Sequence, residues 1–217
     1  AARYQTDGGG LAVLPYASND LETSAMVAIA APDSVDRSAL SAYLRGVIAS
    51  PDSTREGRMF ALAGLAGLGE AVLPAIRTAA ADPSLTIREQ LMIALGAVAL
   101  GDADTAQDLA STLVDAYGEA ADGQARLKVG ATAADITWAT AHMAVLAAAL
   151  GDPLAASFWA YVEANPAADQ LQSLPAIAYV QAVLERAPVS RATFAYTIQG
   201  VRTVASLDDA RSFGLTL

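Results

Sequence analysis

The sequence contains no cysteine among its 217 residues, and histidine occurs once, as His142. The absence of cysteine excludes disulfides, thiolate zinc sites and a cysteine nucleophile from this chain. His142 lies in an apolar stretch of a predicted helix, and Asp135, the acid nearest to it in that helix, is seven residues away. A metal site needs several converging ligands, so we expect a core or groove histidine and no metal or cofactor.

Basic residues are few and scattered, with 13 of them against 23 acidic residues, and the net charge is −10. Nucleic-acid binding requires a basic face, so this charge excludes that function. Although 54% of the residues are hydrophobic, no uninterrupted apolar run reaches the roughly 18–20 residues of a membrane span. We expect a soluble domain, linked to a membrane only through parts of a parent protein outside this segment.

Apolar residues recur at helical spacing along most of the chain, and alanine, a strong helix former, is abundant. Aspartate, serine, threonine, glycine and proline punctuate this pattern as helix start and stop signals. The sequence predicts nine helices, over residues 20–30, 34–50, 53–69, 71–81, 86–100, 102–117, 133–150, 153–164 and 174–186.

Three similar tripeptides each close one alanine-rich helix and precede another: Leu-Gly-Glu at 68–70, and Leu-Gly-Asp at 100–102 and 150–152. A glycine directly after a helix commonly adopts positive φ. The repeat therefore predicts stacked helix hairpins. The wider second interval contains a segment near 119–130, in which Asp122-Gly123 and alternating residues predict a β-hairpin insertion.

The periodicity changes after Pro188. Residues 191–198, 200–204 and 211–217 alternate as short β-strands do. We expect a helical domain over 1–188 and a short β segment over 189–217, the start of a following β domain. Both ends of the chain have the character of cuts in a longer polypeptide.

The chain opens with a glycine-rich stretch in which Gln5, Asp7, Gly8 and Gly9 stand close together. A phosphate loop needs a preceding strand and a suitable following helix, which this stretch lacks, so a structural turn is favoured over a ligand loop. The four residues are similar to the Gln-x-x-Asp-Gly-Gly signature of α/α-toroid repeats. Two departures are the single residue between Gln5 and Asp7, and Gly10 where an aromatic residue is common.

With the alanine-rich helix that follows and the β segment at the end, the chain resembles the α/α-toroid region of bacterial α2-macroglobulin-related proteins. The resemblance implies a mainly α fold of stacked hairpins that form a partial or truncated toroid. Residues 3–5 would then end an earlier helix. The thioester motif of that family would lie upstream, so the resemblance covers a region without it.

The resemblance further implies a non-catalytic, extracytoplasmic module of a cell-envelope or secreted protein. Its partner would be a protein such as a protease, and its role protease trapping or envelope defence. Two alternatives stay open. The stretch 82–102 resembles HEAT-like repeats, which implies a helical scaffold, and toroids also include enzymes that act on isoprenoids. The Asp-rich motifs of those enzymes are absent from the sequence, which favours a protein that is not an enzyme.

Four aromatic residues fall on two successive predicted helices: Trp138, Phe158, Trp159 and Tyr161. Aromatic side chains of this kind either fill the seam between helices or anchor a partner protein. Both interpretations remain open, and the second makes these four residues the candidate partner-binding site.

Overall fold

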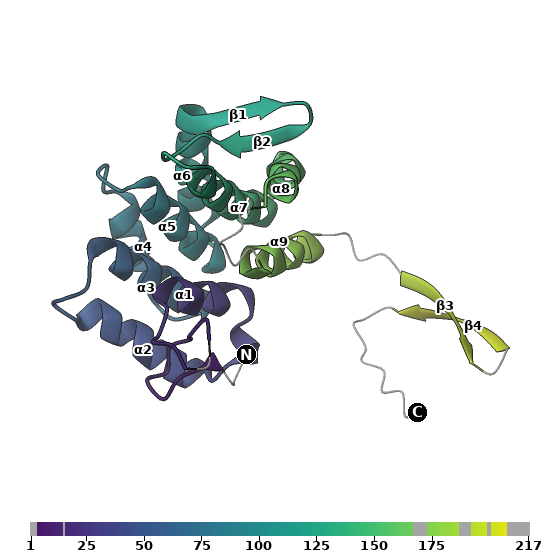
Figure 1. Ribbon diagram of the computed structural model, residues 1–217, viewed down its shortest axis with the longest axis horizontal. Coiled ribbons are helices and arrows are strands. Elements are labelled where there is room, and N and C mark those ends of the chain that lie inside the picture. The colour runs from purple at the N-terminus through teal and green to yellow at the C-terminus, as the bar shows by residue number, and fades with distance from the viewer. Residues whose placement is uncertain (1–3, 15, 167–172, 187–191, 199–200, 208–217) are drawn as a thin grey trace.

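The computed structural model describes residues 4–14, 16–166, 173–186, 192–198 and 201–207, and the chain is mainly helical over them, as predicted (Figure 1). Nine α-helices lie within these ranges: α1 (Leu21–Ala30), α2 (Arg37–Ala49), α3 (Arg55–Gly67), α4 (Leu73–Ala80), α5 (Ile87–Ala99), α6 (Ala103–Tyr117), α7 (Ala133–Leu150), α8 (Ala155–Ala164) and α9 (Ser173–Arg186). One 3₁₀ turn, η2 (Pro32–Ser34), follows α1.

Helix starts follow from the capping residues in the sequence. The Asp20 carboxylate accepts the backbone N–H of Thr23 at the start of α1. Capping boxes open α5 and α7, where Thr86 and Thr132 are the N-caps. Because such side chains satisfy N–H groups that the first turn leaves unpaired, they fix where each helix begins.

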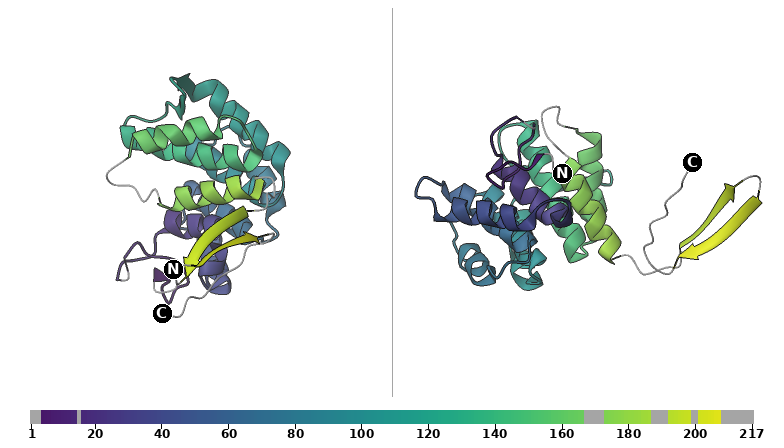
Figure 2. Two further views of the ribbon diagram at one scale, coloured as in Figure 1. Left: turned by 90° about the vertical axis from the view of Figure 1, so that its right-hand side faces the viewer. Right: turned by 90° about the horizontal axis from the view of Figure 1, so that it is seen from below.

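The odd-numbered helices contact one another in chain order. α1 packs on α3, α3 on α5, α5 on α7 and α7 on α9, and α9 in turn packs against α1. α1 and α9 lie side by side in Figure 1, although they are far apart in the sequence. The even-numbered helices pack outside this set, and Figure 2 shows the same arrangement from two other sides.

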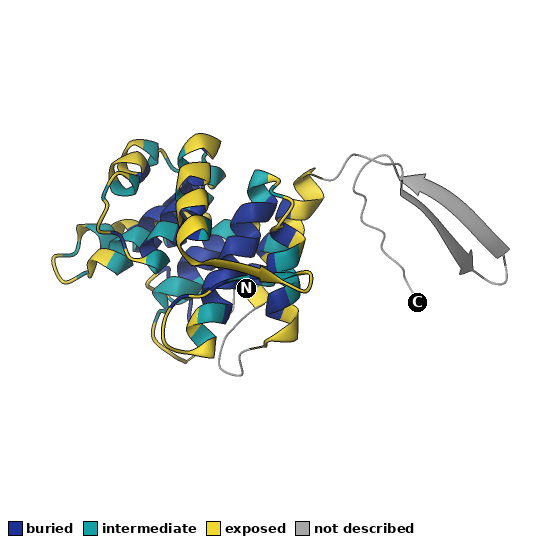
Figure 3. Cartoon of the chain, turned by 90° about the horizontal axis from the view of Figure 1, so that it is seen from above, coloured by how far each residue is buried: buried dark blue, intermediate teal, exposed yellow. Residues whose placement is uncertain are grey.

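Small residues let the odd-numbered helices approach closely. A Cβ on Gly67 of α3 would lie 2.7 Å from the Ala28 carbonyl oxygen of α1, and one on Gly96 of α5 would lie 3.1 Å from Cα of Ala63 in α3. These contacts explain why the core is rich in alanine and glycine. Figure 3 shows the buried residues in the middle of the helical body and the exposed residues around it.

The repeated tripeptides end their helices in one way. Gly69, Gly101 and Gly151 have φ values of 75°, 78° and 75°, the left-handed conformation expected after a helix. The acidic residue that follows accepts hydrogen bonds in each repeat, from Ser41 and Arg45 of α2 at Glu70 and from nearby residues at Asp102 and Asp152. Asp102, for example, accepts a hydrogen bond from Thr105 at the start of α6.

Two antiparallel β-hairpins complete the described chain. β1 (Gly118–Ala121) and β2 (Gln124–Leu127) pair around the turn at Asp122-Gly123, where the sequence predicts an insertion. β3 (Ala192–Ile198) pairs with β4 (Val201–Leu207), to one side of the helices in Figure 1. The third strand, predicted over 211–217, lies outside the described residues.

Candidate functional site

The glycine-rich opening stretch is a turn that is held by side-chain hydrogen bonds. The Gln5 amide donates to the Asp36 carbonyl oxygen at 2.9 Å and accepts the Asp36 N–H at 2.8 Å, which ties this stretch to the start of α2. Gly9 has φ of 84°, and a Cβ there would lie 2.2 Å from the Ala39 carbonyl oxygen. Asp7 and Gly8 are exposed at the tip of the turn.

The prediction that residues 3–5 end an earlier helix agrees with Tyr4, which has 3₁₀-helical backbone, and is wrong at Gln5. That residue forms an isolated antiparallel bridge with Leu11, because the chain reverses through the glycines and returns beside itself. Arg3 lies outside the described residues.

The four predicted aromatic residues do not form one surface patch. Trp138, Phe158 and Tyr161 are buried, with 7%, 2% and 9% of their surface exposed. Trp159 is half-buried, and its ring stacks on Tyr179 with 4.7 Å between centroids. Tyr161 lies under the Arg126 guanidinium, away from the rings that Trp138 contacts. Their observed contacts are those of residues that fill seams between elements.

Trp138 belongs to a polar cluster at the N-terminal ends of the odd-numbered helices. Arg88 of α5 donates to Glu22 of α1 and to Glu56 of α3, each at 2.8 Å. Its guanidinium lies 4.0 Å from the Trp138 ring centroid of α7. The indole N–H in turn donates to Glu22. This Arg88 cluster therefore ties four consecutive odd-numbered helices together at one end.

His142 lies next to this cluster and stacks on Trp138, with 3.9 Å between ring centroids. Its Nδ1 lies 2.8 Å from the Trp138 carbonyl oxygen, so Nδ1 carries the proton and Nε2 carries a lone pair. Nε2 is buried and has no hydrogen-bond partner among the described residues. Burial is the main cause that lowers the pKa of His142 to about 4, so the ring is neutral at pH 7.

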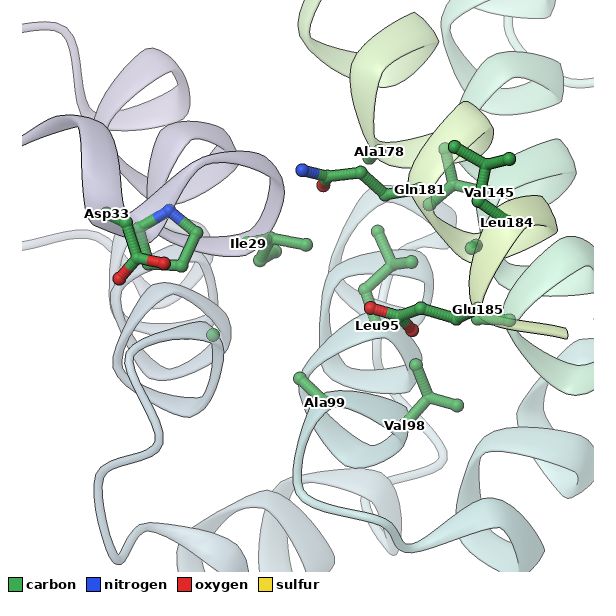
Figure 4. Close-up of a pocket in the computed structure, with 14 residues that line it drawn as sticks. Ile29, Asp33, Leu95, Val98, Ala99, Val145, Ala178, Gln181, Leu184 and Glu185 are labelled. Atoms are coloured by element: carbon green, nitrogen blue, oxygen red, sulfur yellow. The ribbon is translucent and has the colours of Figure 1, made fainter. Parts of the chain in front are cut away.

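A pocket opens at the opposite end of the same helices (Figure 4). It has a volume of about 590 Å³, and all five odd-numbered helices contribute to its lining. Most of the lining residues are apolar, among them Leu95 and Val98 from α5 and Val145 from α7, but polar atoms provide about as much of the pocket surface as apolar atoms do. The Gln181 and Glu185 side chains of α9 point toward the opening between α9 and α1.

α9 carries a second apolar stripe beside this pocket. Pro175, Ala178 and Ala182 are buried against the neighbouring helices, whereas four large apolar residues of α9 are exposed. These residues are Ile177, Val180, Val183 and Leu184, with exposures of 43%, 52%, 43% and 65%. We call them the α9 face. Contiguous exposed apolar residues beside a pocket are typical of protein-binding surfaces.

The described residues include no group of three or more metal-ligating side chains. Of the helices described, α7 alone is long and apolar enough to span a bilayer, but 67% of that stretch is buried within the helical body, as in a core helix. The geometry thus offers a pocket of mixed polarity and an apolar helix face beside it, both of which suit binding.

The pocket and the α9 face were not predicted from the sequence. The signal available was the spacing of Ile177, Val180 and Leu184 at i, i+3 and i+7, which forms an apolar stripe separate from the one through Ala178 and Ala182. A helix with two apolar stripes either packs against apolar residues on both sides or leaves one stripe exposed to solvent.

Comparison with known proteins adds no further assignment. No protein-family model matches this chain, and no curated protein matches it in sequence at a significant level.

Proposed function

We propose that this chain is a non-catalytic protein-interaction module with an α/α-toroid arrangement, from a bacterial α2-macroglobulin-like surface protein. The observation that carries the binding role is the exposed apolar α9 face, with the pocket beside it. The link to α2-macroglobulins, and with it protease trapping or envelope defence, rests on the resemblance of Gln5, Asp7, Gly8 and Gly9 to the toroid signature.

The contact between α9 and α1 supports a toroid over an open HEAT-like scaffold. In an open solenoid each repeat contacts only its neighbours, so the first and last helices stay apart. Amide hydrogen exchange separates the two. A closed ring predicts that α1 and α9 open with free energies close to that of α5. Opening of α1 and α9 at much lower free energy, as at frayed repeat ends, would favour the scaffold.

The binding role is tested with a photo-cross-linking amino acid placed at Val180, in cells that make the protein. We expect a discrete adduct with one partner protein, identified by mass spectrometry. The same probe at Thr112, an exposed residue of α6, serves as the matched control. Equal adducts from both positions, or none from Val180, would argue against a binding surface on α9.

The family link makes separate predictions. In intact cells, an external protease should reach the chain if it lies on the surface. If the full protein traps proteases, a protease mixed with it should lose activity on large protein substrates and keep activity on a small peptide. If the protease keeps its activity on both substrates, the full protein does not trap proteases.

An isoprenoid enzyme is the second candidate, because most residues that line the pocket are apolar and two carboxylates, Asp33 and Glu185, are among the others. Both residues are exposed, whereas a catalytic acid of this kind would be expected deep in the cavity. Titration with farnesyl diphosphate and Mg²⁺ tests the idea. Saturable binding that Leu95→Trp abolishes would favour the enzyme over the interaction module.

A further inference from the structure

We infer that the pocket and the α9 face take a basic, amphipathic segment of a partner protein, with its cationic side chains at the pocket opening and its apolar side chains on α9. This inference rests on the proposed binding role and adds the chemistry of the partner. Three observations carry it: the direction of the helices, the charges at the opening and the shape of the apolar surface.

The odd-numbered helices all end at this pocket. Its lining includes Ile29 near the end of α1, Gly67 at the end of α3, Ala99 at the end of α5, Ala149 near the end of α7 and Glu185 near the end of α9. Each helix C-terminus carries roughly half a negative charge from aligned peptide dipoles. Five such ends around one opening create a negative potential that favours cations.

Two arginines of the chain already use this potential. Arg37 donates to the Leu68 carbonyl oxygen at the end of α3 at 2.8 Å, and Arg186 donates to the Ala149 carbonyl oxygen near the end of α7 at 2.7 Å. The helix ends at this opening therefore accept guanidinium groups within the molecule itself.

One negative side chain adds to this potential, because the charge of Asp33 is offset by Arg37, which pairs with it at 3.1 Å. Glu185 points to the opening and has no ion-pair partner among the residues described. The chain as a whole carries −10. A partner segment that brings lysine or arginine to Glu185 would complement these charges, and an acidic segment would be repelled.

The apolar part of the surface determines the apolar side of the partner segment. Leu184 lines the pocket and is also the most exposed member of the α9 face, so the two surfaces are continuous. Ile177, Val180 and Leu184 form a stripe along α9 that matches the apolar side of an amphipathic helix. The charges and the stripe together select a segment that is apolar on one side and basic on the other.

The test uses two labelled 18-residue amphipathic peptides, one of leucine and lysine and one of leucine and glutamate, with binding followed by fluorescence anisotropy. We expect the lysine peptide to bind about 10-fold or more tightly than the glutamate peptide, with affinity that falls as salt rises. The double variant Asp33→Asn/Glu185→Gln should weaken lysine-peptide binding by about 3- to 10-fold.

A matched control removes the effect of overall charge. Asp108→Asn/Asp115→Asn changes two exposed carboxylates of α6 and alters the net charge equally. It should change lysine-peptide binding by less than about 2-fold, since the charges lie outside the site. Equal weakening by the two double variants would overturn the inference, because binding would then follow net charge alone.

The remaining outcomes separate the inference from the proposed function. If both peptides bind equally and Val180→Asn/Leu184→Asn weakens both, the α9 face binds partners but does not select basic ones, and the inference is overturned alone. If neither peptide binds, or if that variant changes nothing while its thermal unfolding matches the parent, both proposals are overturned.

Discussion

The Arg88 guanidinium lies 4.0 Å from the ring centroid of Trp138 while it donates to carboxylates on two other helices. One side chain of α5 thus contacts α1, α3 and α7 at once. Its side chain keeps 39% of its surface exposed, so water screens part of this attraction. The cluster has the features of an interhelical clamp, since each of its charges has a partner within the molecule.

Arg88→Ala should lower the free energy of unfolding by about 1–2 kcal/mol, because it removes two charged hydrogen bonds and the stacking on Trp138. Urea unfolding at 25 °C measures the change. Arg58→Ala is the control, because the Arg58 side chain has no hydrogen bond or ion pair among the described residues, and it should change stability by less than about 0.5 kcal/mol. Equal effects would contradict a clamp.

His142→Phe should remove a pH dependence of stability. The pKa of His142 is lowered from 6.5 to about 4 in the folded chain, so the unfolded chain binds the proton more readily between these values. Because of this histidine, the free energy of unfolding should fall by about 2–3 kcal/mol as pH falls from 7 to 4.5. The nearby charges of Glu22 and Arg88 also act on the ring.

Urea unfolding of both proteins at pH 7 and pH 4.5 measures this difference. The carboxylates titrate in both, so their contribution cancels when the two pH effects are subtracted. A parallel loss of stability in the parent and in His142→Phe would show that the ring does not resist protonation.

Asp102→Asn should destabilise the protein in a pH-dependent way. Hydrogen bonds from Arg77 and Thr105 lower the pKa of Asp102 from 3.8 to about 2. The stabilisation is present above pH 3.8 and is lost as pH falls through about 2. The urea midpoints of the parent and the variant should differ most at neutral pH and converge toward pH 2. Asp108→Asn, at an exposed α6 residue, should show no such convergence.

Gly9→Ala and Gly46→Ala should change stability in opposite directions. At Gly9 the backbone is left-handed and a Cβ would meet the Ala39 carbonyl oxygen, so we expect a loss of about 2 kcal/mol or more. At Gly46 the space beside α2 is open, so alanine should stabilise the helix by about 0.5–1 kcal/mol. Thermal unfolding measures both, and a neutral Gly9→Ala would contradict the close contact.

The helices could be predicted from the sequence because their signals are local. Caps such as Asp20 and Thr86, and stops such as Gly101, act within a turn or two of where they stand. The bounds of α5 and α7 fall within a residue of those that such signals predict. The hairpin of β1 and β2 follows from Asp122-Gly123 for the same reason.

The contacts at both ends of the odd-numbered helices could not be predicted in this way. Arg88 and its carboxylate partner Glu22 are separated by 66 positions, and no periodicity links residues that far apart. The four aromatic residues show the same limit. Their spacing places them on adjacent helices, but only packing decides that Trp138 and Phe158 face inward.

The contact between α1 and α9 also bears on how the chain reaches its fold. A linear array of hairpins gains stability one repeat at a time and folds from any point outward. Here the first and last helices must find each other across the whole helical body, which raises the contact order and favours slow folding. The contact between α1 and α9 also helps to enclose the pocket, so partner binding at that opening would stabilise the complete fold over any partly assembled one.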